Sequence, residues 1–328
     1  MSIIQILSAP LSFGLPAMQR INTAMLPKGL AVLVCLFTMA LCLYPGRARA
    51  WEPASVIWHS GDTIVHVLED RPGSMDVALF SGPASAAQRE AYFTQGKAPA
   101  AIGAFLVRKG GRAILVDTGF GDAVPGVSAL LLQLASLNIS PEKVDTVLLT
   151  HAHSDHAGGL LHEGQRVFPK ARVLVCAAEL DYWLGLNAKD ANNANAALVR
   201  KVVDAYGDDI QTFSAGDEVL PLIGSIDASG HTPGHTAFRF KAEKGGDLLI
   251  AGDAIHAAAL QFPLPEECAS YDMDKEKAVA ARKMLLSLAA QENLIFAGMH
   301  LPYPGAGKVS VQGKGFDLDL LRLTPQPQ

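Results

Sequence analysis

The sequence predicts an α/β protein, because short aliphatic strands alternate with helices and several strands end in polar loops. Residues 144–149 form an aliphatic, β-branched run that indicates a buried strand, and a histidine-rich loop follows it directly. Residues 223–228 and 247–251 repeat this arrangement later in the chain. Residues 275–288 have the pattern of an amphipathic helix. Strands that end in polar loops are typical of α/β proteins, whose binding sites lie at strand ends.

The other elements follow in order along the chain. Strands are expected at 56–58 and 63–68, before a turn at 70–73 that contains proline and glycine. Residues 102–107 and 113–116 predict a hairpin around Lys109-Gly110-Gly111. The remaining elements are a short helix within 81–99, a helix at 128–137, a strand at 171–175, helices at 178–186 and within 187–207, and a final core strand at 293–297.

The first 50 residues differ in composition from the rest of the chain. They carry four basic residues and no acidic one, and residues 30–43 are apolar over a length typical of a signal peptide. Ala48-Arg49-Ala50 then gives the A-x-A cleavage pattern before Trp51. We therefore expect residues 1–50 to be a signal peptide, with a periplasmic or secreted mature protein that keeps no stable membrane anchor. A membrane anchor is the alternative, and Met1, Met18 and Met25 stay open as the start.

The charge and the cysteine content of the chain restrict the partners and the disulfide bonds that we expect. Without residues 1–50 the chain has 27 − 4 = 23 basic and 32 acidic residues, a net charge of −9. This acidic balance argues against nucleic acid as a partner. Cys176 and Cys268 remain in that chain; they could pair, although Cys176 lies in a strand-like run that favours a small buried side chain.

The loop after residue 149 reads Thr-His-Ala-His-Ser-Asp-His, with three histidines and one aspartate within six residues. The imidazoles of His151 and His153 can point to one metal ion, while Asp155 and His156 can face a second ion close by. Two adjacent ions can share a bridging hydroxide, which is a nucleophile at neutral pH. The loop therefore predicts a dinuclear hydrolytic site.

This loop resembles the T-H-x-H-x-D-H signature of the metallo-β-lactamase superfamily. Further motifs resemble that family: Gly-His-Thr-Pro-Gly-His-Thr at 230–236, Gly252-Asp253 after a strand, and a histidine at 300. The resemblance implies an α/β fold over residues 51–323, an αβ/βα four-layer sandwich of two mixed β-sheets flanked by helices. The composition of residues 324–328 predicts a disordered tail. The resemblance also implies these metal ligands: His151, His153, Asp155, His156, His231, Asp253 and His300.

The same resemblance implies two positioning residues outside the ligand set. Asp117, in Asp117-Thr118-Gly119, would orient a metal-bound histidine, with a turn or helix cap as the alternative. His235, the second histidine of its motif, would be structural. The implied cofactors are two divalent metal ions; zinc suits the donor set, and manganese, iron or cobalt also fit.

Asp253 also bears on the branch of the superfamily, because true metallo-β-lactamases lack a bridging aspartate there. Lactonases, phosphotriesterases, glyoxalase II enzymes and RNA-processing nucleases share the dinuclear set, and the acidic charge and export signal disfavour nucleases. The chain resembles the exported methyl parathion hydrolase group in three segments, at residues 300–305, 313–316 and 261–262. The resemblance implies hydrolysis of a small lactone or ester, or of an organophosphate triester. A glyoxalase II-like thioesterase or a β-lactamase-type amide hydrolase is the alternative, and a homodimer stays open.

The catalytic candidates are Asp155, Asp253 and His256. At the position of His256, lactonase relatives commonly carry a tyrosine and phosphotriesterase relatives an aliphatic residue. An imidazole there could donate to the substrate oxygen or protonate the leaving alkoxide, or it could merely pack beside the site. Four aromatic residues are candidates for the pocket wall, although each residue type is also common in cores: Phe120, Trp183, Phe262 and Tyr303.

Overall fold

The computed structural model of this chain describes residues 54–121, 129–186 and 193–323. The expected signal peptide and the expected C-terminal tail therefore lie outside the described residues. All statements on structure below concern the described ranges.

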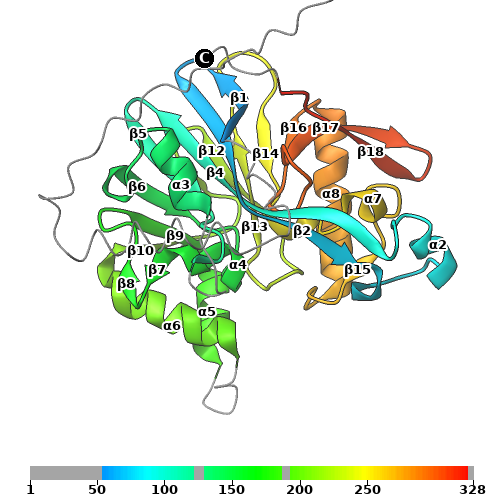
Figure 1. Cartoon of the computed structure of the whole chain (residues 1–328), viewed down its shortest axis with the longest axis horizontal. Helices are drawn as coiled ribbons and strands as arrows, with labels where there is room; N and C mark the ends of the chain where they lie inside the picture. Colours follow the sequence, from blue (N-terminus) through cyan, green and yellow to red (C-terminus); the bar gives the residue numbers. More distant parts are fainter. Residues whose placement is uncertain (1–53, 122–128, 187–192, 324–328) are drawn as a thin grey trace, which may run out of the picture. The chain divides into compact units, whose positions relative to one another are not determined.

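Two seven-stranded sheets form the centre of the fold (Figure 1). The first sheet has the order β1 (Ser55–Ser60), β2 (Thr63–Asp76), β4 (Lys97–Lys109), β5 (Arg112–Val116), β6 (Val144–Leu148), β9 (Arg172–Cys176) and β10 (Ile210–Phe213). The second sheet has the order β11 (Glu218–Leu220), β12 (Ile223–Asp227), β13 (Thr236–Phe240), β14 (Leu248–Ile250), β16 (Ile295–Ala297), β17 (Ala306–Gln312) and β18 (Gly315–Leu320). Each sheet is mixed, since it contains parallel as well as antiparallel pairs. In the first sheet the parallel strands are β5, β6, β9 and β10, and in the second they are β14 and β16.

Helices cover the outer face of each sheet, and the inner faces pack on each other. The helices are α2 (Ala86–Glu90), α3 (Ala129–Ser136), α4 (Ser154–Ala157), α5 (Ala177–Gly185), α6 (Ala194–Tyr206), α7 (Ala258–Gln261) and α8 (Lys275–Gln291). α3 and α6 share an apolar cluster with the first sheet, and α8 shares one with the second (Figure 1). A third cluster, including Val65, Phe105 and Phe238, fills the space between the sheets. The predicted four-layer αβ/βα sandwich is confirmed.

Local sequence explains where several elements begin. Asp274 accepts a hydrogen bond from the Lys277 amide and caps the start of α8. Ser85 and Gln88 form a capping box at α2. Two short antiparallel pairs complete the strands: β3 (Phe80–Ser81) with β15 (Cys268–Ala269), and the hairpin of β7 (Leu161–His162) and β8 (Gln165–Arg166).

Two expectations about strands were wrong. The turn expected at 70–73 does not form, because β2 continues to Asp76 in antiparallel pairing with β4, with a register shift between Glu69 and Arg71. β1 pairs with β2 only as far as Val67, so Pro72 lies on an edge where its missing amide proton is tolerated. The strand at 295–297 is not the last one, since the β17–β18 hairpin extends the second sheet.

Cys176 and Cys268 are both buried and both free, so they do not pair. Burial raises the pKa of the Cys268 thiol. Among the helices of the described residues, none is long and apolar enough to cross a membrane.

Candidate metal centre

Loops that follow the strands of both sheets meet at one edge of the sandwich. From the first sheet, the loop after β5 carries Asp117 and the loop after β6 carries residues 150–159. From the second sheet, the loop before β13 carries His231, the turn after β14 carries Asp253 and the loop after β16 carries His300. All the predicted ligand positions therefore lie at the strand-end edge that α/β proteins use for binding.

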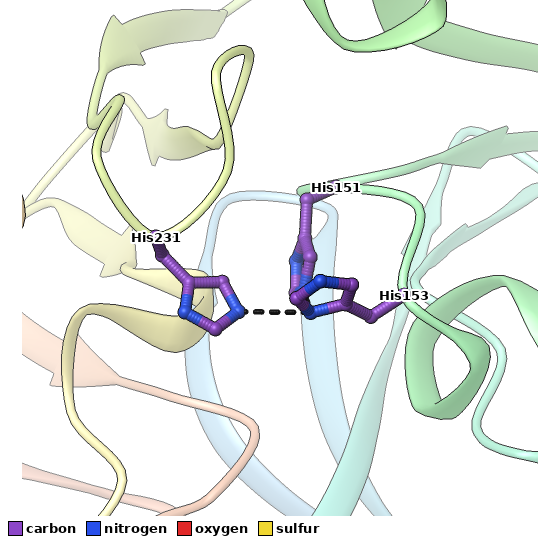
Figure 2. A group of neighbouring side chains, drawn as sticks. All are labelled: His151, His153 and His231. Atoms are coloured by element: carbon purple, nitrogen blue, oxygen red, sulfur yellow. Dashed lines mark hydrogen bonds between the residues drawn. The ribbon is translucent and has the colours of Figure 1, made fainter. Parts of the chain in front are cut away.

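The first cluster consists of imidazoles only, and we call it the imidazole cluster (His151, His153 and His231; Figure 2). The Nδ1 atom of His153 lies 3.0 Å from Nε2 of His151 and 3.0 Å from Nε2 of His231. Ligands that lie roughly 2.0–2.1 Å from a tetrahedral zinc ion are about 3.3 Å from one another. The spacing of the three nitrogens therefore suits one metal ion.

The second cluster mixes two carboxylates with two imidazoles, and we call it the carboxylate cluster (Asp155, His156, Asp253 and His300). His156 Nε2 lies 3.2 Å from Oδ1 of Asp253, and His300 Nε2 lies 3.0 Å from Oδ2 of the same residue. Asp253 Oδ2 is also 3.3 Å from His231 Nε2, which belongs to the imidazole cluster. Asp253 is therefore placed to serve both clusters, as expected of a bridging carboxylate.

Three of the predicted ligand histidines, His156, His231 and His300, are oriented by a partner on the Nδ1 atom of the ring. Asp117 Oδ2 accepts from His156 Nδ1 at 2.7 Å and from the Thr150 hydroxyl at 2.7 Å. The Asp272 carboxylate lies 3.1 Å from His231 Nδ1, and the Ala101 carbonyl accepts from His300 Nδ1 at 2.9 Å. Such partners fix the tautomer and the ring direction.

His235 has a different role from the ligands. Its Nδ1 faces the Ala228 carbonyl at 2.9 Å, so its Nε2 is free to accept a hydrogen bond from the Asp253 amide at 2.9 Å. Gly252, at φ 55°, makes this approach possible, because a Cβ there would lie 2.4 Å from His235 Nε2. His235 therefore positions the backbone of Asp253.

Glu179 forms hydrogen bonds with loops that follow strands of both sheets. Its buried carboxylate accepts from the Ala152 amide of the first metal loop and from the Trp183 indole. It also accepts from the Thr232 hydroxyl and the Gly234 amide of the His231 loop. One side chain thus holds the loops that carry the imidazole cluster.

The two clusters have opposite electrostatic preferences. Burial lowers the pKa of His153 and that of His231 to about 4, so the imidazole cluster presents neutral nitrogen lone pairs. Burial alone would also lower the pKa of His300, but the carboxylates of Asp253 and Asp155 outweigh it and raise the pKa to about 10. The carboxylate cluster therefore favours positive charge at its centre.

Unpaired buried atoms test whether the residues fit metal ions. Within the described residues, His156 Nε2 and Asp253 Oδ1 are buried without a hydrogen-bond partner. Buried polar atoms without partners are rare in proteins, and here both point into the carboxylate cluster. A divalent cation at that point would satisfy both atoms, so the donor set fits the two implied ions.

A cavity of about 430 Å³ opens onto both clusters. Phe120 lines it, as expected. The other three aromatic candidates lie elsewhere: Trp183 is fully buried behind His153, and Phe262 packs in the core under α8. Tyr303 packs against the core between the sheets, and its hydroxyl lies 2.7 Å from Ser55 Oγ. Those three side chains do not line this cavity, because a large aromatic side chain fits a core as well as a pocket wall.

Four residues that line the cavity or hydrogen-bond to the loops of the centre were not identified by the sequence analysis: Glu179, Asn195, Tyr271 and Asp272. Asn195 and Tyr271 line the cavity, and Asn195 also accepts from the Ser154 amide. Glu179, Asn195 and Asp272 each contact a loop distant in the sequence. An acidic residue in the polar run 270–274 was the only local signal for Asp272.

Two known proteins match parts of this chain in sequence. An uncharacterized protein, YobT, of Bacillus subtilis (strain 168) is 27% identical over 202 residues, 57% of this chain and 79% of YobT. The N-acyl homoserine lactonase AttM of Azorhizobium caulinodans is 30% identical over 135 residues, 38% of this chain and 46% of AttM.

Two solved structures are similar over most of this chain. AidC, described as a dizinc quorum-quenching lactonase, superposes with a TM-score of 0.76 at 25% identity, covering 83% of this chain and 99% of AidC. AbOPH, described as a hydrolase in the beta lactamase superfamily, has a TM-score of 0.75 at 28% identity, covering 84% and 100%. The family described as the metallo-beta-lactamase superfamily matches residues 101–313. The chain belongs to the metallo-beta-lactamase superfamily.

Proposed function

We propose that this chain is a dinuclear metal-dependent hydrolase that opens lactones and related small esters. The observation that carries the proposal is the single cavity that exposes atoms of both clusters, including His153, Asp155 and Asp253. A substrate bound there would lie against residues of both clusters. Lactonases among the relatives and structural neighbours support the substrate class.

The walls of the cavity suit an ester with an apolar tail. Met75, Ala100, Ile102 and Phe120 form an apolar side, whereas Asn195 and Tyr271 add an amide and a hydroxyl. A few polar groups in a largely apolar cavity fix the orientation of a small ligand. We assign the apolar side to an acyl or alkyl chain and the polar side to its amide or ring oxygen.

Bound divalent ions would supply a hydroxide at neutral pH and polarise the scissile carbonyl. The protein's own residues hold the reacting parts in place. Asp253 spans both clusters, while Asp117 and Asp272 fix the directions of His156 and His231. His151 and His156, one from each cluster, are completely buried. Burial of the surrounding groups strengthens the electrostatic effects that act on a reacting carbonyl.

The test compares substrates on one purified protein. Zinc-loaded full-length protein would be assayed with N-acyl homoserine lactones, an aryl phosphotriester, a thioester and a carbapenem. The proposal expects kcat/KM to be highest for the lactones and to vanish with a chelator. A phosphotriester, thioester or carbapenem hydrolysed more efficiently than every lactone would overturn the substrate class, and the phosphotriester result would favour the methyl parathion hydrolase group.

We also propose export, with cleavage between Ala50 and Trp51. The apolar run at 30–43 and the small residues before Trp51 support it. N-terminal sequencing of protein recovered outside the cytoplasm should begin Trp51-Glu52-Pro53. An intact N-terminus on protein confined to the cytoplasm would contradict this proposal and leave the enzymatic one untouched.

A further inference from the structure

His256 is a buried histidine beside the two clusters whose ring has no hydrogen-bond partner. Its side chain is 1% exposed, and within the described residues neither Nδ1 nor Nε2 has a hydrogen-bond partner. By contrast, His156, His231 and His300 each have a partner on Nδ1. A buried polar group without a partner requires an explanation, such as an ion that the group binds.

The ring of His256 is held in a fixed position. Its backbone amide donates to Gln261 Oε1 at 2.7 Å, and the buried Gln261 amide donates in turn to the Glu267 carbonyl. The ring stacks on His300, with centroids 5.2 Å apart and an interplanar angle of 23°. Because backbone and ring are both restrained, the direction of the Nε2 atom is part of the fold.

That direction is toward Asp253. His256 Nε2 lies 3.3 Å from Asp253 Oδ2, the oxygen that is also 3.3 Å from His231 Nε2. Ligand atoms of His231, Asp253 and His256 all lie within 4.8 Å of one another. Two imidazole nitrogens and one carboxylate oxygen form a donor set that zinc, cobalt and manganese accept.

We propose that His256 is an eighth metal-binding side chain, which forms with His231 and Asp253 a third coordination position facing the cavity. His231 also belongs to the imidazole cluster, and Asp253 also belongs to the carboxylate cluster. An ion at the third position would therefore take the place of an ion in one of these clusters, and the total would stay at two. The centre thus has three overlapping positions for two ions. The inference rests on the proposed metal-dependent function and adds a position next to the substrate cavity.

The decisive test introduces a ligand with its own spectroscopic signal. Full-length protein carrying His256→Cys would be loaded with Co²⁺ in the absence of substrate. Coordination by the new thiolate gives sulfur-to-cobalt charge-transfer absorption in the near ultraviolet, which imidazole ligation lacks. His66→Cys is the matched control, because His66 is also buried, at 6% exposure, with both ring nitrogens unpartnered, but lies outside the centre. The wild type corrects for Cys176 and Cys268.

The expected result is a charge-transfer band in His256→Cys and none in His66→Cys or the wild type. Cobalt bound to His256→Cys without the band would overturn the proposal. A second variant, His256→Phe, covers the case in which the cysteine variant does not fold. It should weaken cobalt binding by at least about tenfold in a chelator competition. Unchanged cobalt affinity with a reduced lactone rate would show that His256 contacts substrate only, and would also overturn the proposal.

These measurements are independent of the enzymatic proposal. A protein that shows the cobalt signals and no lactone hydrolysis would refute the substrate class and support the third position. A protein that hydrolyses lactones without the cobalt signals would do the reverse.

Discussion

Buried histidines occur in two regions of this molecule, and their surroundings differ. At the strand-end edge, His156, His231 and His300 each have a partner on Nδ1, which aims Nε2 at the shared centre. In the wall of the first sheet, His66 lies on β2 between Val56 of β1 and Leu106 of β4, and neither of its ring nitrogens has a partner among the described residues.

The difference lies in what fixes the direction of the ring. A partner on one ring nitrogen selects the tautomer that presents a lone pair on the other, which a metal ion requires. His256 lacks such a partner, but its Nε2 lies 3.3 Å from Asp253 Oδ2 and so faces the centre. His66 lies away from the centre, and burial together with Arg108 lowers its pKa to about 4. Each of the following predictions alters either a residue of the metal centre or His66 of the first sheet.

The largest effect is expected from Asp253→Ala, because Asp253 Oδ2 approaches histidines of both clusters. The variant should lose one of two ions per chain and reduce kcat by about a thousandfold or more, since two-ion chemistry needs both ions. Elemental analysis and steady-state kinetics would measure the two effects. Two ions per chain with wild-type kcat would contradict the bridging role.

A smaller, separable effect is expected from the orienting carboxylates. Asp272→Asn should weaken the ion of the imidazole cluster, and Asp117→Asn the ion of the carboxylate cluster, each by about 10–100-fold. Stepwise metal titration of both variants would resolve which ion is affected. If both variants weakened the same ion, the assignment of one carboxylate to each cluster would be wrong.

The smallest effect concerns stability and not chemistry. His66 has a pKa of about 4 in the folded chain and an ordinary value of 6.5. As the pH falls below 6.5, the unfolded chain binds a proton that the folded chain refuses, so stability present above pH 6.5 is lost progressively toward pH 4. Between pH 7 and pH 5 this loss is about 2 kcal/mol.

His66→Leu removes the titrating group and keeps an apolar side chain of similar reach. Denaturant unfolding of wild type and variant at pH 7 and pH 5 isolates the contribution, because any release of metal at low pH affects both proteins. The variant should lose about 2 kcal/mol less than the wild type over this interval. Equal losses would show that His66 is hydrated or paired in solution.

The sequence predicted the four-layer fold and the positions that converge at the centre, because each motif is contiguous and follows a recognisable strand. It did not reveal Asp272 or Glu179, whose contacts join loops 41 and 53 residues apart in the chain. It also placed a turn at Pro72, since proline usually interrupts strands. Pairing with β4 shows that Pro72 lies in a strand, and the end of the β1–β2 pairing at Val67 shows that this position is an edge. Local patterns do not encode these long-range contacts.

The hydrogen bonds between β4 of the first sheet and the loop after β16 of the second sheet have a consequence for engineering. The His300 ring and the Met299 carbonyl are both hydrogen-bonded to β4, through the Ala101 carbonyl and the Gly103 amide. A cut in the turn between β10 and β11 would leave four side chains of the two clusters on the first fragment and three on the second, together with His256. Neither fragment alone could complete the imidazole cluster or the carboxylate cluster, whereas the proposed third position would lie wholly on the second fragment. Chimaeras that exchange one half with a relative would therefore need to preserve the backbone match along residues 101–103.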